Sequence, residues 1–126
     1  MAARVEAAPG RSVSANHVVL VGRLAAPASG RTLPSGDELI TWRLVVDRPP
    51  ERSRGVGSGG RAVTIDTVDC VGWTAGVRRS VASWAAGDVV RVEGALRRRF
   101  WRAPTGGPAS RYEVEALKVS RLARAG

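Results

Sequence analysis

The fold prediction starts from VVRVEGALRRRFW, residues 89–101, in which a strand pattern continues into a cluster of arginines. Apolar residues such as Val90 and Val92 alternate with charged ones, which is the period of a β-strand with one buried face. The stretch ends on two neighbouring aromatic residues, Phe100 and Trp101. Because successive side chains of a strand point to opposite faces, we expect one of these two rings in the core.

Three segments before this stretch also have the composition of strands. They are NHVVLVGRL at residues 16–24, LITWRLVVD at residues 39–47 and AVTIDTVDCV at residues 62–71. Residues 29–38, SGRTLPSGDE, are rich in turn-forming residues and are expected to turn the chain back between the first two. Residues 51–61, ERSRGVGSGGR, predict a mobile, exposed loop with a basic tip between the second and the third.

One helix is predicted, beginning near Thr74. Val77, Val81 and Trp84 recur at helical spacing, so we expect Trp84 to be buried on the apolar face of this helix. Gly87 stands where the helix is expected to stop. The strand predicted at residues 89–101 follows directly.

The final strand is predicted at residues 112–122, YEVEALKVSRL, after a flexible loop at residues 102–111, RAPTGGPASR. The order is therefore three strands, one helix and two strands. This is the element order of the OB-fold, a five-stranded Greek-key barrel that binds oligonucleotides or oligosaccharides on one face. We predict an all-β protein of this kind, with its helix between the third and fourth strands.

The charge of the chain predicts a polyanionic partner. The formal net charge is +9 and the isoelectric point is near 11.6, which favours nucleic acid first and an anionic membrane surface second. Nearly all the cations are arginine, and part of that excess is discounted as ordinary solvated surface. A length of 126 residues fits one domain. We predict a flexible extension at residues 1–15, the folded domain at residues 16–122 and a short end at residues 123–126.

The sequence predicts a binding protein rather than an enzyme. Cys70 is the only cysteine, so an intramolecular disulfide and a cysteine-based zinc cluster are excluded, and we expect a cytoplasmic protein. No set of nucleophile, base and orienting group is recognisable. The pairs Asp66 with Asp69 and Glu113 with Glu115 are expected to be solvated surface charge. We expect no catalytic residue, no metal site, no cofactor and no membrane helix, since no apolar run approaches the ~20 residues that a membrane helix needs.

Three adjacent arginines, Arg97, Arg98 and Arg99, precede the two aromatics and predict contact with single-stranded nucleic acid. Phosphates attract arginine whatever the base sequence, and an unpaired base has a face that stacks on an aromatic ring. The alternative interpretation is a solvated strand end, which is the commoner meaning of a basic cluster. The neighbouring rings and the flexible loop beside them favour nucleic acid.

The motifs NHVVLVGRL, WRLVVDR, VDCVGW, GDVVRVEGALRRRFW and YEVEALKVSRL, in this order, resemble the bacterial single-stranded-DNA-binding protein family. The resemblance covers residues 16–122. It implies an OB barrel that assembles as a homo-oligomer, usually a tetramer, and that binds and protects single-stranded DNA at the nucleoid in replication, recombination or repair. Two alternatives remain, an interaction subunit that pairs with a longer paralogue and a single-stranded RNA-binding protein on the same fold.

The resemblance also implies the binding residues. Trp101 and Trp73 match base-stacking aromatics, and this match makes Trp101 rather than Phe100 the exposed ring of its pair. Trp42 matches an aromatic whose role is either stacking or core. The matching basic residues, around the cleft or near the loop between the second and third strands, are Arg23, Arg48, Arg52, Arg54, Arg97, Arg98 and Arg99.

Two departures from the family pattern change the expectation. The sequence ends at Gly126 with RLARAG, where members often carry a long tail with an acidic tip. Recruitment of replication proteins through such a tail is therefore not expected. In addition, Asp66 and Asp69 stand near the position of a further aromatic. We expect one stacking platform fewer and weaker wrapping of DNA.

Overall fold

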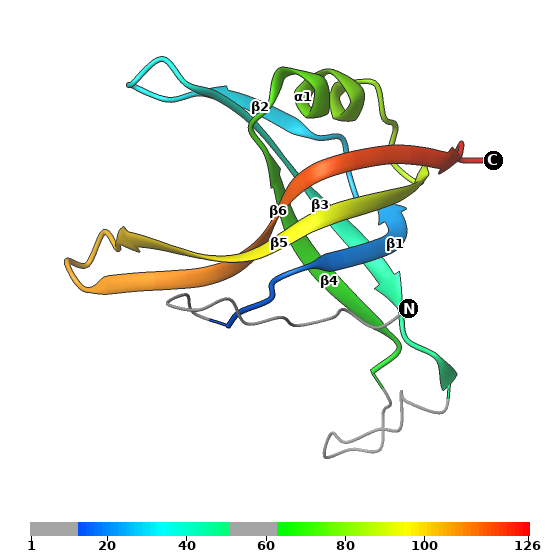
Figure 1. Ribbon diagram of the computed structural model, residues 1–126, viewed down its shortest axis with the longest axis horizontal. Helices are drawn as coiled ribbons and strands as arrows, with labels where there is room; N and C mark the ends of the chain where they lie inside the picture. The colour runs from blue at the N-terminus through cyan, green and yellow to red at the C-terminus, as the bar shows by residue number, and fades with distance from the viewer. Residues whose placement is uncertain (1–12, 51–62) are drawn as a thin grey trace.

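The computed structural model describes residues 13–50 and 63–126. The loop predicted at residues 51–61, with Arg52 and Arg54, and most of the predicted N-terminal extension lie outside the described residues. The described ranges form six strands and one helix (Figure 1). These are β1 (Val18–Leu24), β2 (Ser29–Thr32), β3 (Glu38–Asp47), β4 (Ile65–Gly72), α1 (Ala75–Ala82), β5 (Val89–Arg102) and β6 (Pro108–Ala123).

Five of the strands close into a barrel. Hydrogen bonds join them in the order β1-β5-β6-β4-β3, and β1 also pairs with β3, which completes the ring. Neighbouring strands are antiparallel except β4 and β6, which run parallel. The helix α1 lies between β4 and β5 in the chain, where the sequence predicts it. The five predicted strands are therefore present, and β2 is an addition to them.

The strand β2 extends the sheet beside the first half of β3. The sequence predicts a turn over residues 29–38, but the turn is confined to the segment in which Gly36 has a φ of 93° and the Leu33 N–H donates to the Asp37 carbonyl. Ser29 to Thr32 pair instead with residues of β3. All four residues of β2 are exposed, so the strand has no apolar alternation by which the sequence could reveal it.

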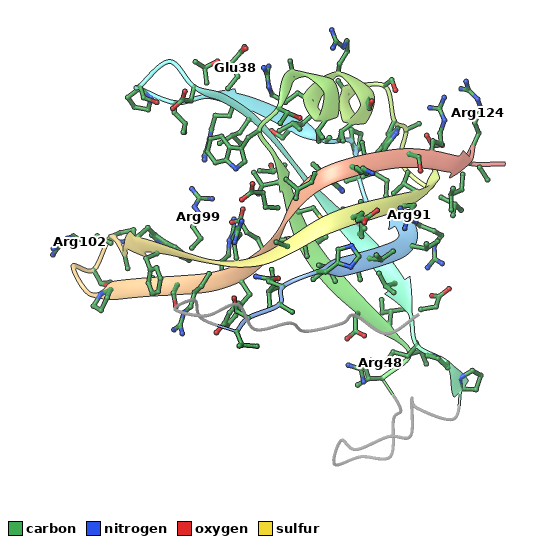
Figure 2. The ribbon with its side chains drawn as sticks, viewed as in Figure 1. Glu38, Arg48, Arg91, Arg99, Arg102 and Arg124 are labelled. Atoms are coloured by element: carbon green, nitrogen blue, oxygen red, sulfur yellow. The ribbon has the colours of Figure 1, made fainter. Side chains whose placement is uncertain are left out.

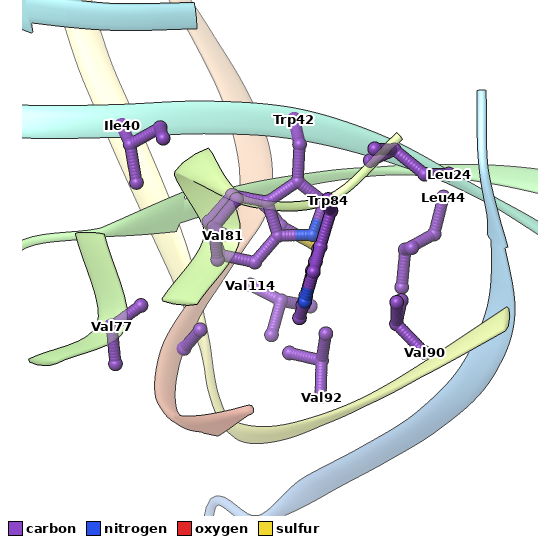
Figure 3. Close-up of a cluster of buried hydrophobic side chains, with 12 residues drawn as sticks. Leu24, Ile40, Trp42, Leu44, Val77, Val81, Trp84, Val90, Val92 and Val114 are labelled. Atoms are coloured by element: carbon purple, nitrogen blue, oxygen red, sulfur yellow. The ribbon is translucent and has the colours of Figure 1, made fainter. Parts of the chain in front are cut away.

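The core fills the inside of the barrel with side chains from alternate strand positions and from the helix and the segment that follows it (Figure 3). Trp42 and Trp84 pack edge to face there, with ring centroids 5.9 Å apart and planes at 87°. Trp84 is buried, as predicted. Trp42 is only 5% exposed, which corrects its inclusion among the candidate base-stacking residues. Its position on β3 points inward, so the core alternative is right and the stacking alternative is wrong.

The helix α1 is shorter than its sequence pattern suggests. The Thr74 hydroxyl accepts a hydrogen bond from the Val77 N–H and caps the N-terminus. The helix ends at Ala82, and Gly87, with a φ of 88°, lies in the following turn rather than at the helix end. No helix in the described part of the chain is long and apolar enough to cross a membrane.

The strands β5 and β6 form a hairpin that projects beyond the barrel (Figure 1). Pairing continues to Arg102 and Pro108, so the flexible loop predicted at residues 102–111 is wrong except for its central turn. Past the barrel, the buried core of residues 13–50 and 63–126 covers neither side of this hairpin. Phe100 is therefore 69% exposed and Trp101 42% exposed, and the expectation that one of the two rings is in the core is also wrong.

Candidate nucleic-acid interface

The β5–β6 hairpin divides the arginine run between its two sides. Arg97, Arg99 and Trp101 alternate onto the side that continues the outer surface of the barrel. Arg98 and Phe100 point to the opposite side, with the Arg98 guanidinium 5.2 Å from the centre of the Phe100 ring. Strand alternation therefore places these three consecutive arginines on two sides of the hairpin, although they form one cluster in the sequence.

Two adjoining hollows on the outer surface form what we call the outer cleft. The first has a volume of about 350 Å³ and lies over β3, β4 and β6, where its polar lining is Ser29, Thr41, Arg43, Asp69, Arg111 and Glu113. The second has a volume of about 330 Å³ and is lined by Arg31, Arg99, Trp101 and Arg111. Because Arg111 lines both hollows, they form one continuous surface that ends at the ring of Trp101.

Carboxylates are interleaved with the arginines of this surface. Asp69 accepts a hydrogen bond of 3.0 Å from Arg43 Nε and lies 3.9 Å from Arg111 Nη1. Glu115 pairs with Arg97 at 3.1 Å. These contacts correct the expectation that the acidic pairs are only solvated charge. The side chains hold arginines in place, and a bound phosphate has to compete with them.

Glu113 is the most buried of these carboxylates. Its side chain is 9% exposed and lies 3.9 Å from Arg99 Nη1, while its Oε1 atom has no hydrogen-bond partner within the described residues. A buried carboxylate with too few hydrogen-bond partners is costly, so a nearby cation such as Arg99 stabilises it. Even so, arginines outnumber carboxylates here, since Arg31, Arg43, Arg97, Arg99 and Arg111 face Asp69, Glu113 and Glu115. The outer surface therefore stays positive.

Trp101 places an open aromatic ring at the arginine-rich end of the outer cleft. The Arg111 guanidinium lies 5.9 Å from the centre of the ring, within the range of a cation–π contact. Arg99 projects from the same side of the hairpin, upward in Figure 2, and lines the same hollow. A flat ring and two cations thus border one hollow, where a base and its phosphates can be held together.

The other two predicted arginines of the described chain lie away from the outer cleft. Arg23, near the C-terminal end of β1, pairs with Asp47 at the C-terminal end of β3 at 3.0 Å. Arg48 pairs with Asp66 at 2.7 Å beyond the end of β3. The hydrogen bond between them raises the pKa of Arg48 and lowers the pKa of Asp66. Neither arginine lines the hollows that contain Trp101 and Arg111.

Trp73 follows β4 directly and is 42% exposed. Gly72 points into the core, since a Cβ there would meet Val77, so alternation directs Trp73 to the outer surface. Its ring does not line the outer cleft. Its carbonyl accepts a hydrogen bond from Arg78 Nε at the start of the helix. Trp73 is thus a second open ring on the same surface, outside the two hollows.

The sequence pattern did not predict three arginines of the outer cleft, namely Arg31, Arg43 and Arg111. Arg43 occupies an outward position of a predicted strand, and that alternation was a usable signal. Arg31 and Arg111 fall in segments predicted as a turn and a loop. Only the strand pairing of β2 and β6 brings them beside Trp101.

The only cysteine, Cys70, lies beneath the outer cleft. Its burial, with the nearby carboxylates Asp69 and Glu113, raises the pKa of the thiol to about 12. The thiol therefore stays protonated at neutral pH and is a poor nucleophile. Within residues 13–50 and 63–126, no three His, Cys, Asp or Glu side chains are grouped so as to hold a metal ion.

Comparison with known sequences gives a family match over almost the whole described domain. The model of the single-strand binding protein family matches residues 15–122. A single-stranded DNA-binding protein of Deinococcus radiodurans is 32% identical over 113 residues, which are 85% of this chain and 35% of that protein. A single-stranded DNA-binding protein of Thermotoga maritima is 31% identical over 109 residues, 86% of this chain and 74% of that protein. The chain thus spans about a third of the Deinococcus relative.

Comparison with solved structures supports the fold. A structure described as the Plasmodium falciparum SSB complex with ssDNA superposes with a TM-score of 0.68 at 20% sequence identity. The match covers 90% of this chain and 97% of that one. With the barrel topology and the position of α1, this likeness confirms the predicted OB-fold.

Proposed function

This chain belongs to the single-strand binding protein family, and we infer from this membership that it binds and protects single-stranded DNA. The resemblance found in the sequence is thereby confirmed. The two bacterial relatives are themselves named single-stranded DNA-binding proteins. The inference concerns binding without catalysis, and the site that we propose for it is the outer cleft.

The observation that carries this site is the open ring of Trp101 beside Arg99 and Arg111. An unpaired base stacks on the indole without regard to its identity, while the arginines take the flanking phosphates. Trp73 offers a second ring on the same surface. We propose Trp101 as the principal stacking residue and Trp73 as a secondary one.

Binding of a phosphate requires the cleft arginines to exchange partners. Asp69 and Glu115 hold Arg43 and Arg97 in the free protein. Phosphates along a strand replace these carboxylates and release condensed counterions. The carboxylates orient the arginines before binding, but they also reduce the net free energy gained when DNA binds. This competition between carboxylates and phosphates is consistent with the weaker wrapping of DNA that is expected from the acidic residues of β4.

Raising the salt concentration is expected to weaken binding of oligothymidine steeply. If Arg31, Arg43, Arg99 and Arg111 each neutralise one phosphate, the slope of log affinity against log salt is about −3, so each doubling of salt lowers affinity about sevenfold. Tryptophan fluorescence titrated with oligothymidine at several salt concentrations measures this slope. Absence of binding even at low salt contradicts the proposed function, and salt-independent binding contradicts the phosphate contacts.

Replacing Asp69 with asparagine is expected to raise the affinity for oligothymidine about two- to fivefold. Asp69 contacts both Arg43 and Arg111, and exposed ion pairs of this kind contribute about 0.5–1 kcal/mol. Asp66→Asn is the matched control, because Asp66 pairs with Arg48 away from the outer cleft. The same titration compares both variants. An affinity gain in the control, or none in Asp69→Asn, would argue against phosphate binding by these arginines.

We further propose that the protein acts in the cytoplasm at the nucleoid, in replication, recombination or repair, as a homo-oligomer. The side chains of Val19 and Val21 are exposed on β1 and offer an apolar surface to a second copy. Sedimentation measures the oligomeric state.

Competition between matched DNA and RNA oligonucleotides tests the choice of nucleic acid, and a preference for RNA would overturn the DNA assignment.

A further inference from the structure

The β5–β6 hairpin carries a second aromatic and arginine patch on the side opposite Trp101. It consists of Arg98, Phe100 and Tyr112, and we call it the rear patch. Phe100 is 69% exposed and Tyr112 is 58% exposed. The pairing of Arg98 with Tyr112 across the two strands puts all three side chains on one side of the hairpin. This part of the hairpin lies beyond the barrel, so the core does not cover the patch (Figure 1).

Arg98 is held between the two rings. Its guanidinium lies 5.2 Å from the centre of the Phe100 ring and 5.4 Å from that of Tyr112. Ser110 Oγ accepts hydrogen bonds from Arg98 Nε at 3.2 Å and Nη2 at 2.9 Å. Unlike Arg97, which pairs with Glu115, Arg98 has no carboxylate within 4.0 Å in the described ranges. Its charge is therefore fixed in place and not neutralised.

The uncompensated charge decides what kind of partner fits. Packing the rear patch against the rear patch of a second copy would bring the two Arg98 guanidinium groups together without an anion between them, which is costly. A polynucleotide supplies a phosphate for Arg98 and flat bases for the two rings. The patch has the same chemistry as the outer cleft, with the difference that no carboxylate of the described residues competes for its arginine.

A third hollow connects the two sides of the hairpin. It has a volume of about 280 Å³ and is lined by Phe100, Trp101, Arg102, Gly106 and Pro108. Phe100 belongs to the rear patch and Trp101 to the outer cleft, so this hollow adjoins both. The hairpin end between Trp101 and Tyr112 contains no Asp or Glu, so a strand that stacks on Trp101 can continue around this end without crossing an acidic side chain of the hairpin.

We propose that single-stranded DNA leaving Trp101 passes around the hairpin and occupies the rear patch, with bases stacked on Phe100 and Tyr112 and a phosphate on Arg98. This proposal rests on the proposed function and extends its site. The outer cleft binds the first few nucleotides, and the rear patch is reached only by longer strands. The hairpin is then a two-sided binding element.

The test compares oligothymidines of about 5 and about 16 nucleotides, the range covered by single OB domains. A Phe100→Ala/Tyr112→Ala double variant is expected to bind the short strand like the unmodified protein and the long strand about tenfold more weakly. Leu122→Ala is the control, because it removes an exposed apolar side chain from the other end of β6. Equal affinities for the long strand, or equal losses for both lengths, would overturn the proposal.

Photocross-linking separates DNA contact from an effect on assembly. Long oligonucleotides that contain 5-iododeoxyuridine are expected to cross-link the tryptic peptide of residues 112–118, which begins at Tyr112, and short ones are not. Failure of the long strand to label this peptide overturns the rear patch. If sedimentation shows that the double variant dissociates while its DNA binding is unchanged, the patch is an interface between copies and the proposal is wrong. If the unmodified protein binds neither length, the proposed function fails first.

Discussion

Replacing Trp101 with alanine is expected to lower the affinity for oligothymidine by about 5- to 150-fold. Stacking of one base on an aromatic side chain contributes about 1–3 kcal/mol, and this ring stands at the end of the outer cleft. Removing the indole also removes the ring against which the Arg111 guanidinium lies. Fluorescence anisotropy of a labelled oligothymidine measures the affinity without relying on the ring that has been removed.

Two further variants make this result specific. Trp101→Phe keeps a flat ring and is expected to retain most of the affinity, whereas Trp101→Leu keeps apolar volume without a ring and should behave like alanine. Because Trp101 is 42% exposed and lies on the hairpin outside the core, each of these changes should lower the free energy of unfolding by no more than about 1 kcal/mol. An alanine variant that binds like the unmodified protein would remove Trp101 from the site.

Replacing Gly94 with alanine is expected to destabilise the fold by at least about 3 kcal/mol. Gly94 lies at the register shift of β5, opposite Ala116 of β6. A Cβ at this position would stand 1.9 Å from the carbonyl oxygen of Glu115, and a backbone atom in a paired strand has no free space to move into. The strain falls on the pair of strands that carries the arginines. Urea denaturation followed by circular dichroism measures the loss.

Gly76→Ala is the matched control for this prediction. Gly76 is inside α1, and a Cβ there meets no atom within 4 Å. The same substitution is therefore expected to stabilise the protein by about 0.5–1 kcal/mol, since alanine favours a helix over glycine. The two variants should move the urea midpoint in opposite directions. Equal stabilities for Gly94→Ala and the unmodified protein would show that β5 and β6 can separate at the bulge.

The sequence was sufficient for the barrel strands because each has one side in the core. Val90 and Val92 on β5 are fully buried, and the alternation around them identifies the strand without knowledge of its neighbours. The helix was recognisable for the same reason, through Val77 and Val81. The strand β2 was missed because no side chain of it is buried. A pattern of burial can reveal only the elements that are buried.

The family resemblance located the hairpin and its exposed tryptophan, but it did not distinguish the roles of individual rings. Trp42 and Trp101 are both strand aromatics in the sequence, and only one of them is accessible. Position within the closed barrel makes the difference. Trp42 faces inward on β3, where Trp84 covers it, and Trp101 lies past the point at which β5 leaves the barrel.

The sequence by itself determined the class of fold, the family, the excess of positive charge and the strand that ends in arginines and aromatics. These properties depend on local periodicity and composition, which the order of residues expresses directly. Only the tertiary structure decided which charges meet. Pairing of β5 with β6 brings Arg111 to Trp101, and pairing of β3 with β4 brings Arg43 to Asp69. Contacts between segments distant in the chain depend on strand register and barrel closure, which local periodicity does not specify.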